Sequence, residues 1–231
     1  MNTKIIIFGA TETEQRFRYY IENQTDDKVS AFCVDAAYKK TELFHDCPVV
    51  TYEEVEKIYS PQDYQFLIGI GYKNMNDVRK EKFYAVKQKG YSLYNFIHKD
   101  AFVDPSVELG EGNIILAGCL LDYHTTLGNG NIVELGTRIP HECKIGDFNY
   151  FAPSCSLGGK VHVENNCFFG INTTIRSAAT IKQYTLIGAG AYVDRNTEPF
   201  SVIVPPRSIS LSRSSREMNL LLQGDKKWKK S

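Results

Sequence analysis

The sequence lacks an excess of charge of either sign. Its 27 Lys and Arg residues balance 27 Asp and Glu residues, so no bulk electrostatic field favours nucleic acid or an anionic membrane. Long hydrophobic runs are also missing. No stretch approaches the roughly 18 apolar residues of a membrane-spanning helix, and the run from Ile5 to Phe8 is too short for a signal-peptide core. We therefore expect a cytoplasmic protein that binds no nucleic acid and inserts into no membrane.

A strict hexad pattern is present instead. Every sixth residue from Val103 to Val193 is Val, Leu, Ile or Phe. This period fits neither the helical period of 3.6 nor strand alternation. It is typical of a solenoid in which each short segment buries one apolar side chain and then turns a corner. Three hexads make one triangular coil, so residue i should lie directly below residue i+18.

The cysteines fit this solenoid better than a disulfide framework. Four of the six fall in a second column, two positions before the apolar one: Cys119, Cys143, Cys155 and Cys167. No two of these four are 18 residues apart, so they do not stack as partners. We expect reduced, buried thiols, as in the cytosol.

The chain divides into three predicted segments: an α/β domain over residues 1–97, a solenoid over 98–196, and an exit segment with a basic tail over 197–231. In the first segment, predicted strands alternate with predicted helices, which favours a small parallel sheet. The strands are Lys4–Ala10, Val29–Asp35 and Gln65–Gly71, and the helices are Thr11–Asn23, Tyr52–Tyr59 and Asn76–Lys89. Ligands bind such sheets at the carboxyl ends of the strands. Those ends carry Gly9-Ala10-Thr11, Asp35 and Gly69-Ile70-Gly71.

A histidine followed by a carboxylate lies at one predicted corner. By the 18-residue rule, His141 lies above Tyr123 and below Gly159, and Glu142 lies below Lys160. A neutral imidazole can take a proton from an attacking amine or hydroxyl. Glu142 can fix its tautomer, and the Gly159 N–H can donate to a developing oxyanion. Spacing alone leaves acyl transfer as one possibility, because His-Glu pairs are common on surfaces.

The segment Ile132–Phe148, followed by Ala152-Pro153 and Leu157-Gly158-Gly159, resembles the hexapeptide-repeat sugar acyltransferases. More narrowly, it is similar to the nucleotide-aminosugar N-acetyltransferases of the sialic-acid-operon and bacillosamine type. The resemblance covers nearly the whole chain. It implies a Rossmann-like α/β domain followed by a left-handed parallel β-helix. The left hand comes from the resemblance alone, since general crossover rules favour the right hand.

The same resemblance implies a mechanism. Members of this family are homotrimers with active sites in clefts between neighbouring β-helices. Acetyl-CoA lies along the β-helix, and the nucleotide of the sugar lies in the N-terminal domain. His141 matches the general base, Glu142 its orienting acid, and Gly159 the backbone donor to the thioester carbonyl. A sugar amine then attacks acetyl-CoA directly, with no acyl-enzyme and no metal.

Further binding residues follow from the resemblance. The expected acetyl-CoA residues are Gly159, Tyr150, Arg176, Lys182, Gly188 and Ala189. The expected nucleotide-sugar residues are Gly9, Ala10, Thr11, Asp35, Gly71 and Glu134. Four cations are candidates for the CoA phosphates, of which we expect two to bind: Arg176, Lys182, Arg195 and Arg207. The run Gly188–Ala191 lets pantetheine approach the backbone closely.

Three positions depart from the family pattern. The N-terminal loop is usually Gly-Ala-Gly-Gly-His, but here Thr11, Glu12 and Thr13 follow Gly9-Ala10. Glu134 stands where the family often has Asn, and Tyr150 stands where the bacillosamine type has His. The last two positions face the acceptor or acetyl group in that family, so the acceptor sugar can differ.

Other functions stay open at this point. A sugar O-acetyltransferase uses the same solenoid and differs chiefly in its acceptor. A metal-dependent hydratase similar to γ-carbonic anhydrases would need three converging histidines, whereas His124, His141 and His162 occupy different hexad phases. A non-catalytic trimeric scaffold would not need the His141-Glu142 pair. The sequence leaves the nucleotide (UDP, dTDP or GDP) and the position of the amine undetermined.

Overall fold

The N-terminal domain is built on one six-stranded sheet with the strand order β3-β4-β2-β1-β5-β6. All neighbours pair in parallel except β3 and β4. The strands are β1 Lys4–Phe8, β2 Lys28–Val34, β3 Leu43–Phe44, β4 Cys47–Thr51, β5 Tyr64–Ile68 and β6 Ser92–Leu93. The helices are α1 Glu12–Gln24, α2 Val55–Ile58 and α3 Asp77–Gln88, with a short 3-10 helix at Ala36–Tyr38. The predicted strands and helices are therefore present, and the β3–β4 hairpin is additional.

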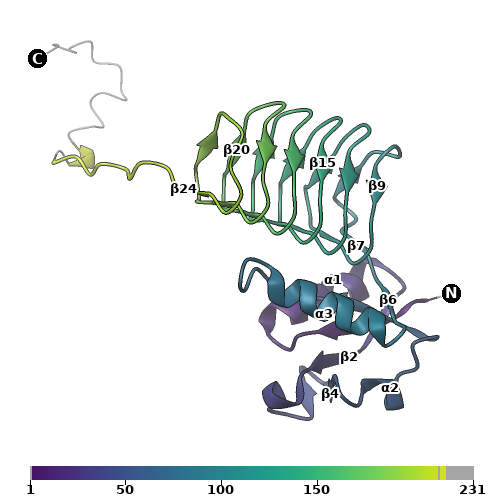
Figure 1. Cartoon of the computed structure of the whole chain (residues 1–231). Coiled ribbons are helices and arrows are strands. Elements are labelled where there is room, and N and C mark those ends of the chain that lie inside the picture. Colours follow the sequence, from purple (N-terminus) through teal and green to yellow (C-terminus); the bar gives the residue numbers. More distant parts are fainter. Residues whose placement is uncertain (1, 213, 217–231) are drawn as a thin grey trace, which may run out of the picture.

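The hexads form a three-sided solenoid of two-residue strands, which stands beside this domain in the computed structural model (Figure 1). The first face contains β7 Phe96–Ile97, β10 Ile114–Ile115, β13 Ile132–Val133, β16 Tyr150–Phe151, β19 Phe168–Phe169, β22 Leu186–Ile187 and β24 Val202–Ile203. The second contains β8 Phe102–Val103, β11 Leu120–Leu121, β14 Arg138–Ile139, β17 Ser156–Leu157, β20 Thr174–Ile175 and β23 Tyr192–Val193. The third contains β9 Glu108–Leu109, β12 Thr126–Leu127, β15 Lys144–Ile145, β18 His162–Val163 and β21 Thr180–Ile181.

The structure describes residues 2–212 and 214–216. Most of the predicted basic tail, from residue 217 to residue 231, lies outside the described residues. Strand β24 lies beyond the expected end of the hexads and pairs with β22. No helix among the described residues is long and apolar enough to cross a membrane.

The register of the solenoid follows the predicted coil. Ile114 pairs with Ile132, and Ile132 pairs with Tyr150, which places residues i and i+18 side by side on successive coils. The hexad side chains point inward and, from Ile115 onward, are almost completely buried; Leu121, Val133 and Phe169 are 0% exposed. Burying each such side chain stabilises the fold by about 1.5–3 kcal/mol. The parallel, all-buried stack fits a left-handed β-helix.

The second inward column is polar or small, as its crowded position requires. Its asparagines form a ladder along the axis: the Asn131 N–H donates to Asn113 Oδ1 (2.9 Å), and the Asn149 N–H donates to Asn131 Oδ1 (2.8 Å). All six cysteines are free and buried, so the predicted burial of the four thiols in this column is confirmed. Burial raises the pKa of Cys119 and Cys143 to about 11.

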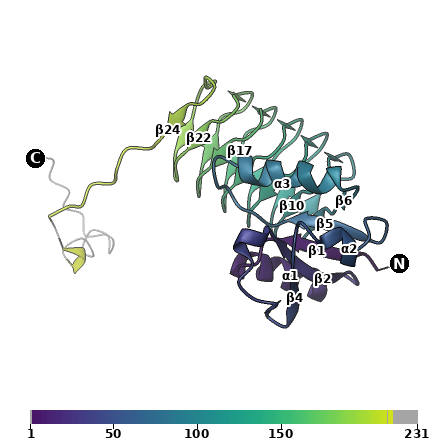
Figure 2. The same ribbon diagram turned by 60° about the horizontal axis from the view of Figure 1, so that its bottom comes forward.

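The first face of the solenoid packs against the N-terminal domain (Figure 2), where Phe96, Ile114 and Ile132 join the core around Phe17 and Ile21 of α1.

One buried arginine on α3 ties the two parts together. Arg79 is 1% exposed and donates to five backbone carbonyls. Two belong to the loop after β5, Ile70 (3.3 Å) and Gly71 (2.6 Å). The other three belong to the solenoid: Gly130 (2.8 Å), Phe148 (3.1 Å) and Asn149 (3.1 Å). Burial without a carboxylate partner lowers the pKa of Arg79.

Candidate active site

His141 lies at the corner that follows β14, on the edge between the second and third faces. Its Nδ1 is 3.3 Å from Oε2 of Glu142. Glu142 has a left-handed backbone (φ 57°), and its N–H donates to the carbonyl of Tyr123 one coil below (2.8 Å). When Glu142 accepts a hydrogen bond from Nδ1–H, Nε2 carries no proton and can act as a base. Sequence spacing predicted this stacking correctly.

Gly159 lies directly against the other side of the imidazole. A Cβ at this position would be 2.4 Å from His141 Nε2 and 2.5 Å from Cε1, so only glycine leaves room for the ring. The Gly159 N–H makes no hydrogen bond within the described part of the chain. A free donor beside Nε2 is what an oxyanion at the reacting carbonyl would need.

The carboxylate of Glu142 has a second partner. Lys160 Nζ lies 3.3 Å from the same Oε2. Hydrogen bonds from Lys160 and His141, in that order, hold the pKa of Glu142 below its ordinary value. Glu142 is therefore ionised at neutral pH.

A cavity of about 390 Å³ lies in the N-terminal domain at the carboxyl ends of β1, β2 and β5. Its walls include four of the predicted nucleotide-sugar residues, Gly9, Ala10, Thr11 and Asp35. Gly71, also predicted, does not line it. Asp35 Oδ1 is 2.8 Å from Lys82 Nζ. Two further lysines, Lys40 and Lys73, line the cavity and make no ion pair among the described residues.

The start of α1 next to this cavity is already capped. Glu14 Oε2 accepts a hydrogen bond from the Thr11 N–H (2.8 Å) and another from its hydroxyl, and the Thr13 N–H donates to Thr11 Oγ1 (3.3 Å). Glu14 is 4% exposed, and its burial raises its pKa. A Cβ at Gly9 or Gly69 would be 2.6 Å from its side chain. Helix starts commonly bind phosphate, but here the Glu14 carboxylate occupies the Thr11 N–H and the Thr11 hydroxyl occupies the Thr13 N–H. Sequence analysis overlooked Glu14, although the spacing Thr-x-x-Glu is a capping-box signal.

A second cavity, of about 400 Å³, separates α1 from the solenoid. Glu134 and Tyr150 line it together with Arg16 of α1. Arg16 Nη2 donates to Glu134 Oε1 (2.8 Å), and the Tyr150 hydroxyl donates to the same oxygen (3.3 Å). The Glu134 side chain is 6% exposed. Burial and the neighbouring carboxylate raise the pKa of Tyr150.

The structure distributes the predicted residues over different edges of the solenoid. The predicted residues that follow second-face strands lie along one edge, which we call the His141 edge: His141, Glu142, Gly159 and Arg176. The predicted residues on or directly after first-face strands lie along a different edge, which we call the Glu134 edge: Glu134, Tyr150, Gly188 and Ala189. Lys182 follows a third-face strand and pairs with Glu164 (2.8 Å).

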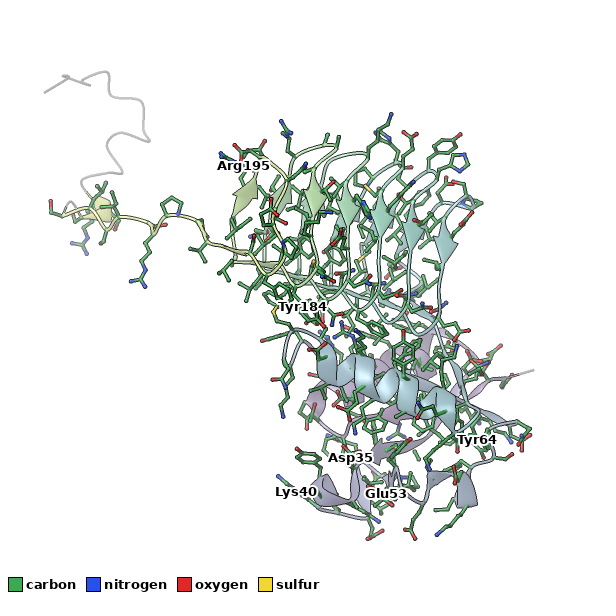
Figure 3. The ribbon with its side chains drawn as sticks, viewed as in Figure 1. Asp35, Lys40, Glu53, Tyr64, Tyr184 and Arg195 are labelled. Atoms are coloured by element: carbon green, nitrogen blue, oxygen red, sulfur yellow. The ribbon has the colours of Figure 1, made fainter. Side chains whose placement is uncertain are left out.

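The His141 edge faces away from the N-terminal cavity. The second-face strands pair in register from Arg138 to Tyr192. His141 follows Arg138 by the same number of residues as Arg195 follows Tyr192, so Arg195 lies on the His141 edge. Figure 3 shows Arg195 on the side of the solenoid remote from the N-terminal domain, whereas Asp35 and Lys40 lie at the opposite end of the molecule. Within one chain, the imidazole and the cavity are therefore far apart.

Comparison with profiles of known protein families finds no match. Comparison with solved structures finds similar chains. PerB from Caulobacter crescentus, solved with CoA and GDP-perosamine, is 25% identical with a TM-score of 0.79, over 87% of this chain and 94% of that one. The resemblance inferred from the sequence is confirmed. The acetyltransferase domain of PglB from Neisseria gonorrhoeae is 21% identical with a TM-score of 0.78, over 88% of this chain and 97% of that one. WeeI from Acinetobacter baumannii is 23% identical with a TM-score of 0.75, over 88% and 97%. The last two likenesses establish a shared fold.

Among residues 2–212 and 214–216, no group of three or more His, Cys, Asp or Glu side chains is arranged to hold a metal ion.

Proposed function

We propose that the chain is an acetyl-CoA-dependent N-acetyltransferase acting on the amine of a nucleotide-linked amino-deoxysugar. The observation that carries this is the arrangement of His141 between Glu142 and the free N–H of Gly159. PerB, whose structure contains CoA and GDP-perosamine, has the same fold, which supports the choice of substrates.

The proposed reaction needs one base and one oxyanion donor. The sugar amine attacks the carbonyl carbon of acetyl-CoA while His141 Nε2 takes its proton. Glu142 stabilises the imidazolium that forms, and the Gly159 N–H donates to the oxyanion. The tetrahedral intermediate then collapses, the C–S bond breaks, and His141 returns the proton to the CoA thiolate. No cysteine is needed as a nucleophile, in keeping with the burial of all six.

The N-terminal cavity is the proposed nucleotide site of a Rossmann-like domain. Asp35 would contact the ribose or base, as in other sheets of this class. Because Glu14 caps α1, we place the diphosphate near Lys40 and Lys73 instead of at the helix start. Glu134 and Tyr150 would then contact the sugar in the adjoining cavity.

We propose that the active site is completed by a second copy of the chain in a homotrimer of left-handed β-helices. The His141 edge and the Glu134 edge meet only if neighbouring solenoids pack side by side. Acetyl-CoA would lie in that cleft, with Arg176 and Arg195 on the His141 edge near its phosphates and Gly188-Ala189 on the facing edge. Lys182 lies on neither of these edges, and Arg207 belongs to the exit segment.

Subunit mixing tests this arrangement. Two inactive trimers, one of His141→Ala and one of Glu134→Ala, are dissociated, mixed in equal amounts and reassembled. If each site takes His141 from one copy and Glu134 from the next, about a quarter of the sites are restored. If both residues serve a site within one chain, mixing restores no activity.

The substrate is tested by measuring CoA release from acetyl-CoA against UDP-, dTDP- and GDP-linked 3- and 4-amino sugars. Chromatography is the readout, because the protein contributes six thiols of its own. Turnover of one sugar supports the proposal and identifies the nucleotide. Failure with every intact amino sugar would favour the O-acetyltransferase alternative.

A cytoplasmic location, where free buried thiols stay reduced, is part of the proposal.

A further inference from the structure

We propose that Lys160 is a positioning residue for the general base and acts on His141 through the carboxylate of Glu142. This inference rests on the proposed function, in which His141 accepts the amine proton. Both partners of Glu142 meet at one atom: Oε2 is 3.3 Å from His141 Nδ1 and 3.3 Å from Lys160 Nζ.

The backbone holds this arrangement independently of the Lys160 side chain. The Lys160 N–H donates to the carbonyl of His141 (3.0 Å), and the Glu142 N–H donates to that of Tyr123 (2.8 Å). Residues 142 and 160 both have left-handed backbones, with φ of 57° and 63°. Their side chains therefore leave successive coils at equivalent positions, and the lysine reaches the carboxylate of the coil below.

The side-chain contact matters because Glu142 has no other anchor. Its side chain is 47% exposed, and no other side chain in the described part of the chain pairs with it. Lys160 restricts the rotation of the carboxylate and keeps Oε2 directed at the imidazole. The nearest coils add Asp122, Tyr123 and His124 below and Arg176 above, but the side chains of these residues form no hydrogen bond or ion pair with the carboxylate.

The ammonium also balances charge. An isolated carboxylate beside Nδ1 favours the imidazolium, which cannot act as a base. A cation on the same oxygen offsets part of that field at the imidazole. Lys160 should therefore affect both the orientation of His141 and the pH at which catalysis begins.

The test compares Lys160→Met with Lys160→Arg, which keeps the charge. We expect Lys160→Met to lower kcat by up to about five-fold, the size of an exposed ion pair. We expect it to move the acid limb of the rate profile upward by about half a pH unit, as for one charge removed at about 6 Å in water. The KM for acetyl-CoA should not change, and Lys160→Arg should restore both quantities. Lys144→Met removes a nearby exposed lysine that forms no ion pair with the described residues and should have a smaller effect.

A double variant separates this role from direct contact with CoA. In a Glu142→Gln background, Lys160→Met should cause no further loss of kcat at the pH optimum, because the positioning contact through the carboxylate is already broken. The shift of the acid limb acts through space and should remain. An equal loss in both backgrounds, or a change confined to the KM for acetyl-CoA, would overturn the proposal. Proton NMR titration of His141 in the protein without substrates reports on the imidazole directly, so this measurement needs no turnover. A titration midpoint that is unchanged in Lys160→Met would also overturn it, whereas a wild type that acetylates no sugar would refute only the proposed function.

Discussion

Replacing Arg79 by Met should loosen the attachment of the N-terminal domain to the solenoid. The substitution keeps an apolar chain of similar length but removes all five hydrogen bonds from the guanidinium. Three of the five carbonyls belong to the solenoid and two to the loop after β5; that of Asn149 keeps its hydrogen bond from the Ile132 N–H (3.0 Å). The lost hydrogen bonds therefore all lie at the interface between the N-terminal domain and the solenoid.

The expected loss is large for a single substitution. Hydrogen bonds from a charged donor contribute about 1.5–3 kcal/mol each, but the cost of burying the guanidinium offsets much of their sum. We expect a net loss of about 3–5 kcal/mol in the free energy of unfolding. For a chain of this size, each kcal/mol lowers Tm by about 2–4 °C, so the total shift is about 6–20 °C.

Chemical and thermal denaturation of wild type and Arg79→Met provide the measurement. Arg18→Met is a matched control, because Arg18 lies at the surface and contacts Glu22 (3.1 Å) and the His45 carbonyl (2.7 Å). It should cost less than about 1 kcal/mol. If Arg79→Met lowers the free energy of unfolding no more than this control does, the buried arginine does not stabilise the interface between the two parts.

Three further predictions concern the site and its surroundings. Gly159→Ala should lower kcat by about 10²-fold with little change in Tm, because its Cβ displaces the His141 ring; wild-type turnover would contradict the assigned geometry. Burial raises the pKa of Glu14 above its ordinary 4.5, so its contribution to stability is fullest below that pH and is lost as pH rises through the raised pKa. Glu14→Gln should therefore gain stability relative to wild type between pH 4.5 and 7 in urea titrations, and a difference independent of pH would argue against this. Chelation with EDTA should leave turnover unchanged, and a loss restored by zinc would reopen the hydratase alternative.

The solenoid could be predicted closely because its signal is repeated. Each hexad adds an independent observation of the same inward position, and the stacking rule then placed His141 against Gly159 without any structure. The α/β domain was predicted less completely. Strand β4 contains Pro48, which cannot donate to a ladder, and β3 has two residues, so neither stands out in the sequence.

Contacts between distant segments could not be predicted. Nothing in the spacing of residue 79 indicates that its side chain reaches carbonyls at 130 and 148. Likewise, the sequence drew attention to Glu12, which stands in the N-terminal loop where the family usually has Gly. In the structure Glu12 lies 3.0 Å from His45, and Glu14 turns inward. Which of two nearby side chains is buried depends on the direction of the helix, which becomes known only from packing.

The division of the solenoid into hexads has a consequence for how such a chain can change length. Inserting a complete coil after Gly159 would keep every later residue on its own edge and would only lengthen the cleft in which acetyl-CoA is proposed to lie. Inserting a single hexad would instead turn the remainder by one face, so that Arg176 and Arg195 would leave the side of His141. The length of the proposed acetyl-CoA cleft can thus change without changing the surroundings of His141, provided that the solenoid changes length in whole coils.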